Sequence, residues 1–587
     1  GDPTLSDKEI IGNESQERMG MLVKKKDLWI VRRTAERERA PYYEVGEVTG
    51  DGRLRFVRKE GEAPIDLAVS DFFGSAPKTV LRDTSRPYRF KKLSYTRRDF
   101  HKYLEKVLQL ESVACKDWLT NKVDRSVTGR VAQQQTVGEV QLPLSNLGVS
   151  ALDYTGTHGI ATAMGHAPIP ALIDPAAGSR LSVSEALTNL VWAPIDGRLS
   201  GISLSANWMW PAKQEGETAR LYVAVKALSD YCVALGVNVP TGKDSLSMTQ
   251  KYPDGGKVVA PGTVIVSAVG EVSDIKKTVR PVMKGDLDSE LLYIDFSKDS
   301  FELGGSSFAQ ALGAVGQYVP DVKSPAYFKR AFNAVQQLIE EGLVMAGHDI
   351  SAGGLITTLL EMNFANTEYG MEIDLKDFDR DDFTAVLFCE RPSVVIQVAG
   401  NGKAQKLLRS LGVSFKVIGK PCTKRQLIIR HNGHDHLFDI DALRDVWFKS
   451  SYLLDRKQSG ERKSLERFRN YKQQYLHFSF GRGFTGQAKD LGIRMNRRKK
   501  SGINAAIIRE KGCQCDREMA YALYLAGFDV KDVTMTDLSS GREDLHDVNM
   551  IVFVGGFSNS DVLGSAKGWA GAFLYNEKAK KALDDFY

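Results

Sequence analysis

Glu185 and Asn189 lie four positions apart in the segment 182–189. In a helix, residues at this spacing share one face. A carboxylate and an amide oxygen placed together there could bind Mg²⁺, which prefers oxygen ligands. The same segment also allows a purely structural interpretation, because Ser182 and Glu185 fit the S-x-x-E pattern of a helix capping box. The residues alone leave both interpretations open.

A glycine-rich loop at 347–354 precedes an apolar stretch, 355–362, that predicts a helix. Such a loop can present backbone N–H groups and the positive end of the helix dipole to an anion. Asp349 in this loop could hold a metal ion that bridges phosphates. The alternative is that Gly353 and Gly354 only allow tight packing. His348, taken alone, is more typical of a structural histidine than of a catalyst.

A second turn-forming segment, 240–248, contains Gly242, Lys243 and Ser245. A flexible backbone, a cation and a hydroxyl donor suit a phosphate group. The segment lacks the spacing of a P-loop, and an ordinary turn remains the alternative.

Near the C-terminus, an apolar strand at 551–554 runs into Gly555, Gly556 and Phe557. Backbone N–H groups in such a loop can stabilise a developing oxyanion, although a plain strand-to-loop turn explains the pattern as well. Upstream, 503–508 predicts a buried parallel strand and 517–526 predicts its crossover helix. The Cys513-x-Cys515 pair is a weak signal for zinc or for a nucleophile, because it has neither a second pair nor a nearby histidine.

Composition and charge narrow the class of protein. The 587 residues include 79 basic and 73 acidic side chains, a net charge of only +6. The one dense basic cluster, 497–500, is expected to be a solvated linker end, so a nucleic-acid binder is disfavoured. No apolar run reaches the roughly 18 residues that span a membrane. Six scattered cysteines indicate a reducing cytoplasm, and the missing initiator Met indicates a chain that begins inside a longer protein.

The elements that position these residues show a weak internal repeat. The segment 13–23 parallels 389–399, and the strand-like 43–46 parallels 416–419. This favours a duplicated large module whose first copy is cut off, with chance similarity as the alternative. The residues 43–48 and 53–57 predict a hairpin.

The ordered set of motifs resembles the large, fused form of formylglycinamidine ribonucleotide synthase over nearly the whole chain. The segments that resemble it are 13–18, 185–189, 203–208, 242–248, 347–354 and 555–570.

The resemblance implies an α/β and α+β multidomain fold with tandem AIR-synthase-like modules, the second complete, and the start of a class I glutaminase α/β domain. AIR-synthase here means aminoimidazole ribonucleotide synthase. The expected boundaries are 1–85 for the end of the first C-terminal domain, 86–278 and 279–445 for the second N- and C-terminal domains, 446–500 for a linker and 501–587 for an incomplete glutamine amidotransferase domain. The unit 279–445 is expected to fold against 90–278 and to form one nucleotide site with it.

The resemblance also implies a reaction. ATP activates the amide oxygen of formylglycinamide ribonucleotide, and ammonia from glutamine displaces phosphate to give formylglycinamidine ribonucleotide and ADP. The expected cofactors are Mg²⁺ and ATP or ADP. The expected partners are these small molecules and the remainder of the same enzyme, with no nucleic acid and no membrane. No catalytic residue is expected in this chain, so the fragment alone should be inactive.

Site residues carried over by motif fall into three groups. The expected substrate contacts are Glu14, Ser15, Gln16 and Ser245. The expected nucleotide contacts are Ser145 and Ser351. The expected Mg²⁺ ligands are Glu185, Asn189 and Asp349, in an auxiliary site that holds a structural ADP. Asn146 stands where the family usually has an aspartate ligand, and this neutral amide should weaken the metal site.

Two other functions remain open from the sequence. One is a non-catalytic nucleotide-binding scaffold. The other is a different ATP-dependent enzyme of the AIR-synthase superfamily, against which the glutaminase-like tail argues.

Overall fold

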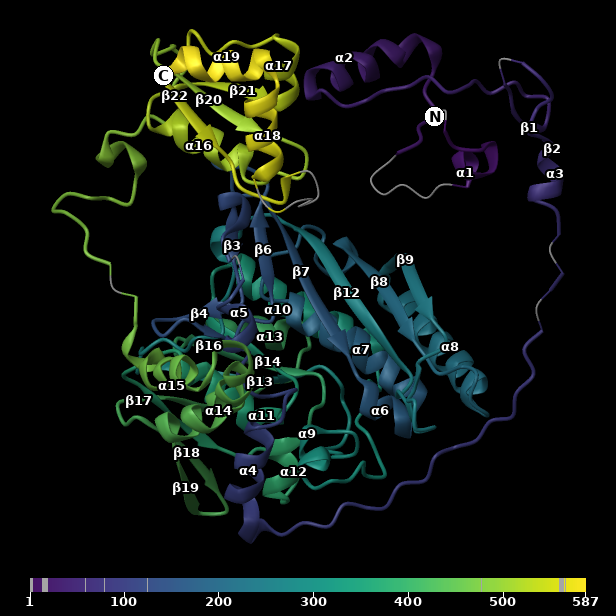
Figure 1. Cartoon of the computed structure of the whole chain (residues 1–587). Helices are drawn as coiled ribbons and strands as arrows, with labels where there is room; N and C mark the ends of the chain where they lie inside the picture. Colours follow the sequence, from purple (N-terminus) through teal and green to yellow (C-terminus); the bar gives the residue numbers. More distant parts are fainter. Residues whose placement is uncertain are drawn as a thin grey trace. The chain divides into compact units, whose positions relative to one another are not determined.

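Two parts of the chain, Gly1–Arg82 and Asp83–Tyr587, fold as separate units in the computed structural model (Figure 1). The structure describes residues 4–12, 19–58, 60–75, 77–78, 80–123, 125–476, 478–558, 564 and 566–587. The boundary lies close to the predicted residue 85. Asp83 belongs to the second unit because its carboxylate accepts hydrogen bonds from the backbone of Gly216 and Thr218, both at 3.0 Å. In the described part of the chain, no helix is both long and apolar enough to cross a membrane.

The first unit contains α1 (Asp7–Ile11), α2 (Leu28–Glu38), β1 (Arg53–Phe56), β2 (Ile65–Ala68) and α3 (Val69–Phe72). The predicted hairpin between 43–48 and 53–57 is wrong, because β1 pairs antiparallel with β2 instead. A strand needs a neighbour to satisfy its backbone groups, and none of the described strands lies beside 43–48. In the second copy of the repeat, β16 (Ser393–Ala399) and β17 (Lys416–Cys422) are strands, whereas 43–46 forms no strand and 13–18 lies outside the described residues.

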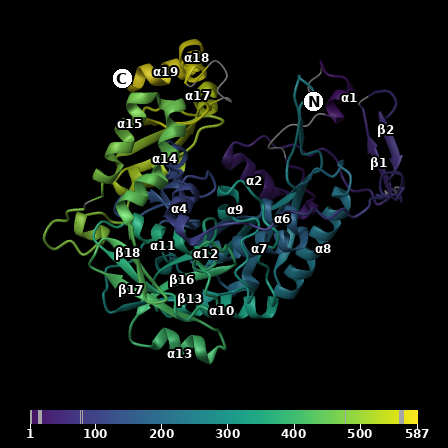
Figure 2. The same cartoon turned by 90° about the horizontal axis from the view of Figure 1, so that it is seen from below.

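The second unit begins with a six-stranded sheet of order β3-β6-β7-β12-β8-β9. Its strands are β3 (Val131–Gln133), β6 (Gly148–Ala151), β7 (Gly159–His166), β12 (Thr263–Val272), β8 (Ile202–Met209) and β9 (Asn238–Ser245). Residues along β7 alternate strictly between buried and exposed, as expected when one face is covered. The covering helix is α7 (Pro175–Leu190), which packs on β7 and lies beside α8 (Glu217–Leu235) (Figure 2).

A seven-stranded sheet follows, with the order β14-β16-β13-β17-β15-β18-β19. Its remaining strands are β13 (Ser289–Asp295), β14 (Val344–Ile350), β15 (Gly370–Asp374), β18 (Gln426–His431) and β19 (His434–Asp439). Its helices include α9 (Ser307–Ala311), α10 (Pro325–Glu340), α11 (Gly354–Phe364), α12 (Phe383–Phe388) and α13 (Lys403–Ser410). The helix predicted at 355–362 is confirmed as α11, which follows β14 directly.

One hydrophobic core joins the two sheets. It contains Leu187 of α7 and Val266 of β12 from the first sheet layer, together with Phe328 of α10 and Ile396 of β16 from the second. All four side chains are buried. The two predicted domains 86–278 and 279–445 therefore pack directly against each other, which brings α7 next to β14.

The prediction that 446–500 is a linker is wrong for the first half of this segment. It contains most of α14 (Ile440–Ser459) and all of α15 (Glu461–Asn470). Trp447 is buried, donates its indole N–H to the Val113 carbonyl at 2.8 Å, and packs on Phe364. Charged residues on the outer faces of both helices conceal this narrow apolar stripe in the sequence.

The C-terminal part is a parallel sheet of order β21-β20-β22. The strands are β20 (Asn504–Arg509), β21 (Asp529–Thr534) and β22 (Met550–Phe553), and the helices are α16 (Asp516–Leu525), α17 (Met535–Ser540), α18 (Lys567–Tyr575) and α19 (Glu577–Phe586). The predicted buried parallel strand and its crossover helix are both confirmed, as β20 and α16.

Candidate functional site

A cavity of about 230 Å³ lies where α7, the loop after β14 and the loop before α9 meet. Glu185 and Thr188 of α7 line one side, and Ser351, Ser307 and Glu390 line the other. Apolar side chains complete the wall; they include Ile169, Leu181 and Pro392. The cavity therefore combines an apolar surface with a few polar groups, the usual character of a small-molecule site.

Glu185 stands in the middle of α7, not at its N-terminus. The helix is capped by Asp174, whose carboxylate accepts hydrogen bonds from Ala176 and Ala177. Ser182 donates its hydroxyl to the Gly178 carbonyl one turn earlier. The capping-box interpretation of Ser182 and Glu185 is thus wrong, because Asp174 starts the helix two turns upstream.

The Glu185 carboxylate accepts a hydrogen bond from the backbone N–H of His166 at 3.1 Å. Burial, together with the neighbouring carboxylates of Asp349 and Glu390, raises the pKa of Glu185 to about 8. A buried carboxylate beside two others is stabilised by a cation. This electrostatic need agrees with the metal-ligand interpretation of Glu185.

Asn189 lies one turn after Glu185 on the same helix and is buried. Its amide nitrogen donates to the Met164 carbonyl at 2.8 Å, which fixes the orientation of the side chain. The amide oxygen is buried and accepts no hydrogen bond within the described structure. Buried acceptors are normally satisfied, so this oxygen is available for a ligand such as a metal ion.

Asp349, at the end of β14, is almost completely buried. The Asn146 amide donates to its two carboxylate oxygens at 3.1 and 3.3 Å. His348 contacts it at 3.1 Å and contacts Glu361 with its other ring nitrogen at 3.0 Å. Burial opposes ionisation of His348, but Asp349 and Glu361 raise its pKa to about 10. His348 is therefore a structural cation between two carboxylates, as expected of a structural histidine.

The donor set fits a hard divalent cation. Glu185 and Asp349 supply carboxylate oxygens, and Asn189 supplies an amide oxygen without a partner. Among the described residues, no cluster of three or more His, Cys, Asp or Glu side chains is arranged to hold a metal ion. The Asn189 oxygen is thus needed to complete the set. Asn146 acts here as a hydrogen-bond donor to Asp349 and not as a further anionic ligand.

The Gly353–Gly354 pair is required for packing. Gly354 has φ +71°, and a Cβ there would lie 2.6 Å from the backbone carbonyl carbon of Phe388. The Gly353 N–H donates to the Glu390 carboxylate at 2.7 Å, and the Gly354 N–H donates to the Ser351 carbonyl. The N–H groups of Gly353 and Gly354 are therefore not free for phosphate, because the protein's own oxygens accept them; for the N–H groups at the start of α11 the expectation stays a prediction.

Glu390 was not predicted as a site residue. It directly precedes β16, and the same carboxylate oxygen that accepts from Gly353 also accepts from the Ser307 backbone at 2.8 Å. The available signal was its position in the segment 389–399, which parallels the segment that contains Glu14.

The other predicted site residues occupy different places. Ser351 lines the cavity. Ser145 is buried and bonded to Gln133 and Leu147, and it does not belong to the cavity lining. Ser245 ends the edge strand β9, where its hydroxyl accepts from Lys243 at 2.6 Å, outside this cavity. Glu14, Ser15 and Gln16 lie outside the described residues.

The predicted oxyanion loop follows β22. Gly556 has φ +123° and forms a bridge with Cys513, while the Gly555 carbonyl accepts from Gln514 at 2.8 Å. Phe557 is exposed. Partial burial raises the pKa of the Cys513 thiol, which is opposite to what an activated nucleophile requires.

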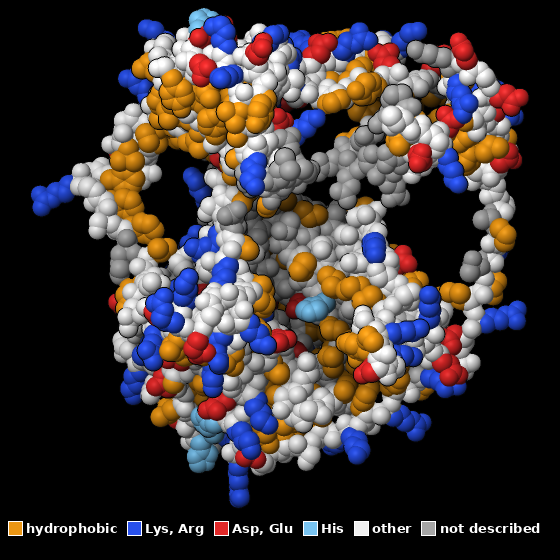
Figure 3. Space-filling model, in the orientation of Figure 1, with side chains coloured by type: hydrophobic (Ala, Val, Ile, Leu, Met, Phe, Trp, Pro, Cys, Tyr) orange, Lys and Arg blue, Asp and Glu red, His pale blue; other side chains and the backbone are white. Residues whose placement is uncertain are grey.

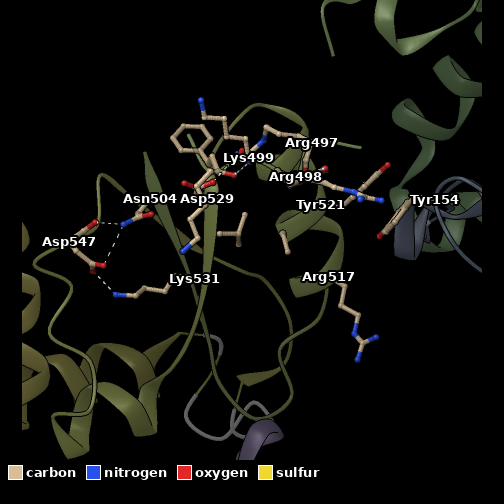
Figure 4. A pocket seen from close by; sticks show the side chains of 15 residues that line it. Tyr154, Arg497, Arg498, Lys499, Asn504, Arg517, Tyr521, Asp529, Lys531 and Asp547 are labelled. Carbon is tan, nitrogen blue, oxygen red and sulfur yellow. Dashed lines mark hydrogen bonds and ion pairs between the residues drawn. The ribbon is translucent and has the colours of Figure 1, made fainter. Parts of the chain in front are cut away.

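A larger, open pocket of about 820 Å³ lies beside the cluster 497–500 (Figure 4). Figure 4 shows Asp547 joined to Asn504 and Lys531 at one end, and Tyr154 stacked on Tyr521 at the other. Arg497 is half-buried and paired with Asp529 at 2.9 Å, so the solvated-linker expectation is wrong for this residue. Residues 498–500 are exposed, as expected.

Basic and acidic side chains are interspersed over the face seen in Figure 3.

Comparison with known families identifies three domains. Residues 115–271 match the FGAR-AT PurM_N-like domain, residues 298–431 match the AIR synthase related protein C-terminal domain, and residues 503–587 match the CobB/CobQ-like glutamine amidotransferase domain. These matches confirm the predicted fold class: AIR-synthase-like N- and C-terminal domains followed by a glutamine amidotransferase domain.

Whole-length relatives agree with these matches. The chain is 38% identical over 620 residues to the probable phosphoribosylformylglycinamidine synthase, chloroplastic/mitochondrial, of Arabidopsis thaliana, covering 100% of this chain and 42% of that protein. It is 38% identical over 613 residues to the phosphoribosylformylglycinamidine synthase of Homo sapiens, covering 100% of this chain and 45% of that protein. The chain thus spans less than half the length of these curated relatives. With all of its own length aligned and three matching domains in order, the chain is similar throughout to these phosphoribosylformylglycinamidine synthases.

Proposed function

We propose that the enzyme to which this chain belongs converts formylglycinamide ribonucleotide to formylglycinamidine ribonucleotide with ATP and glutamine, in purine biosynthesis. The relatives' names and the glutamine amidotransferase match support this carbon–nitrogen ligase activity. In the proposed reaction, ATP phosphorylates the amide oxygen of the substrate. Ammonia released from glutamine then attacks that carbon, and phosphate leaves.

The proposed role of this chain's own cavity is to hold a nucleotide with Mg²⁺. The observation that supports it best is the Asn189 amide oxygen, which is buried without a hydrogen-bond partner in the described structure and lies on the same helix as Glu185, the one of the three proposed ligands that lines the cavity. Glu185, Asn189 and Asp349 would hold the ion. When bound, Mg²⁺ would neutralise phosphate oxygens. The apolar wall with Ile169 and Leu181 would exclude water from the uncharged part of the nucleotide.

The nucleotide proposed for this site is ADP in an auxiliary, structural role. The donor orientation of the Asn146 amide supports this, because it leaves the site with one anionic ligand fewer than the family pattern implies. Ser351 is the proposed nucleotide contact on the cavity wall, and Ser145 would act indirectly from behind it.

Further roles are proposed for residues outside the cavity. Glu14, Ser15, Gln16 and Ser245 are the proposed substrate contacts, and the loop of Gly555, Gly556 and Phe557 is the proposed oxyanion-stabilising element for glutamine hydrolysis. The proposed compartment is the cytoplasm, which fits the free buried thiols of Cys115, Cys232, Cys389 and Cys422.

Calorimetric titration of the chain with Mg-ADP tests the proposed site. Asn189→Leu keeps the side-chain size but removes the amide oxygen. The affinity for Mg-ADP should therefore fall about tenfold or more, and a tenfold fall corresponds to about 1.4 kcal/mol of binding free energy. Adenosine, which needs no metal ion, should bind both proteins equally. Equal affinity of both proteins for Mg-ADP would overturn the assignment of Asn189, and absence of any nucleotide binding to the natural chain would overturn the proposed role of the cavity.

A further inference from the structure

The cavity is unusual for a nucleotide site because its lining contains acidic groups and no basic group apart from one histidine. Glu185 and Glu390 both line it, whereas no lysine or arginine is present in the lining. His166 is the one histidine there. Polyphosphate entering this cavity would therefore meet two acidic side chains and no lysine or arginine.

Glu390 is held in place by two loops distant in sequence. One of its carboxylate oxygens accepts from the Ser307 N–H at 2.8 Å and from the Gly353 N–H at 2.7 Å. Ser307 is the first residue of α9, and Gly353 is the N-cap of α11. The positive ends of both helices thus face this carboxylate. A ligand anion cannot use these two N–H groups while Glu390 occupies them.

The nearest cation in sequence does not neutralise Glu390. The guanidinium of Arg391 donates to the Tyr293 hydroxyl at 2.9 Å and to the Asp299 carbonyl, and it lies 3.7 Å from the centroid of the Phe301 ring. Arg391 is therefore engaged by groups on the strand β13 and the loop that follows it. Glu390 lines the cavity together with Glu185. Burial raises the pKa of Glu390, whereas the N–H groups of Gly353 and Ser307 favour its ionised carboxylate.

We propose that Glu390 is a specificity-determining residue of this cavity: it ties the loop 304–307 to the loop 351–354, and its charge admits a nucleotide only as its complex with a divalent cation. This inference rests on the proposed nucleotide site. It assigns two separable roles to one carboxylate. The hydrogen bonds shape the cavity, and the charge discriminates against free nucleotide.

Two substitutions separate these roles. Glu390→Gln keeps an oxygen that accepts from Ser307 and Gly353 but removes the charge. Glu390→Ala removes both. Calorimetry would measure the affinities for Mg-ADP, for ADP in EDTA and for adenosine, and thermal melting would be recorded without ligand.

Glu390→Gln should bind free ADP about tenfold more tightly than the natural chain, which corresponds to about 1.4 kcal/mol of binding free energy. Its affinity for adenosine should be unchanged, because adenosine has no phosphate charge to repel. Glu390→Ala should melt at a lower temperature and bind all three ligands more weakly. The control Glu372→Gln removes the same charge from an exposed position on β15, outside the cavity, and should change none of these affinities.

The outcomes distinguish this inference from the function on which it rests. If the natural chain binds neither Mg-ADP nor adenosine, the proposed nucleotide site is wrong. If the natural chain binds Mg-ADP and Glu390→Gln leaves the ratio of free-ADP to Mg-ADP affinity unchanged, the discriminating role of Glu390 is wrong. If Glu390→Ala melts and binds like the natural chain, the two loops are not held by this carboxylate.

Discussion

At the scale of single residues, the candidate site depends on acidic groups that are buried close together. Burial raises the pKa of Glu185 to about 8, with Asp349 and Glu390 adding to the effect. A buried carboxylate beside other carboxylates costs stability unless a cation pairs with it. Glu185 is therefore the residue whose substitution best separates ligand binding from folding.

Glu185→Gln should reduce the stabilisation that Mg-ADP gives to the chain, because it removes a charged ligand. In the ligand-free protein the melting temperature should stay the same or rise, since the variant no longer buries that carboxylate. The measurement is thermal melting with and without Mg-ADP. At a ligand concentration of one hundred times Kd, binding stabilises the folded chain by about 2.7 kcal/mol. An equal nucleotide-induced shift in the variant and the natural chain would contradict the ligand role.

Gly354→Ala should destabilise the chain by about 2–4 kcal/mol, through left-handed backbone strain and overpacking together. The new Cβ would lie 2.6 Å from the Phe388 carbonyl carbon. Gly402→Ala is the matched control, because Gly402 has φ +74° but nothing within 4 Å of its Cβ position. Urea unfolding of both variants measures the difference. Equal losses would mean that backbone strain alone, and not close packing, requires Gly354.

Sequence alone could identify part of the site at this scale. Glu185 and Asn189 share a helix face because of local spacing, and Asp349 follows from its glycine-rich loop. The contact of Asn146 with Asp349 joins residues 203 positions apart, and no local pattern contains it. Glu390 was missed for the same reason, since its two partners lie 83 and 37 positions away.

At the scale of elements, α14 shows why composition misled the sequence analysis. Its outer face is charged, so the segment resembles a linker, yet its inner face places Trp447 and Phe448 in the core. By contrast, α11 and β20 were predictable, because α11 is apolar along most of its length and β20 is buried on both faces. Narrow apolar stripes are recognised reliably only when the packing partner is known.

Trp447→Ala should destabilise the second unit by about 3–5 kcal/mol, the usual cost of emptying a large buried site. The side chain also loses its hydrogen bond to the Val113 carbonyl. Leu453→Ala on the same helix is the control, because Leu453 is 41% exposed and should change stability by no more than about 0.5 kcal/mol. Urea unfolding midpoints would measure both. A loss for Trp447→Ala as small as that of the control would restore the linker interpretation.

Asp529 at the start of β21 predicts a pH dependence. Hydrogen bonds from Arg497 and from the backbone N–H groups of Gly502 and Ser501 lower the pKa of Asp529 from 3.8 to about 2. Because the pKa of Asp529 is lower in the folded chain than in the unfolded chain, its ionised carboxylate stabilises the fold above pH 3.8. This stabilisation is lost as the pH falls towards 2. Asp529→Asn should therefore melt at a lower temperature than the natural chain at pH 7.

The difference between Asp529→Asn and the natural chain should stay constant down to about pH 4 and shrink between about pH 4 and pH 2. Asp585→Asn, at an exposed pair with Lys581 on α19, is the control and should show a smaller difference at pH 7. A difference for Asp529→Asn that does not change with pH would show that the carboxylate charge is not what stabilises β21.

At the scale of the whole molecule, the second unit joins two sheets through one core, so the cavity forms only when both are folded. The pairing of the domains was predicted from the family resemblance and from the division of Glu185 and Asn189 from Asp349 between the two units. The strand expected at 43–46 did not form in the first unit, because strand formation depends on neighbours that local sequence does not specify. The central claim is that the shared cavity binds a nucleotide through a divalent cation.

The most direct test is a crystal structure of the chain grown with Mn²⁺ and ADP, because the anomalous signal of Mn²⁺ locates the ion independently of the protein. The account predicts one Mn²⁺ bound directly to oxygens of Glu185, Asn189 and Asp349, with the ADP phosphates beside it. Ordered ADP elsewhere on the chain, or an ion that does not contact the Asn189 oxygen, would contradict it.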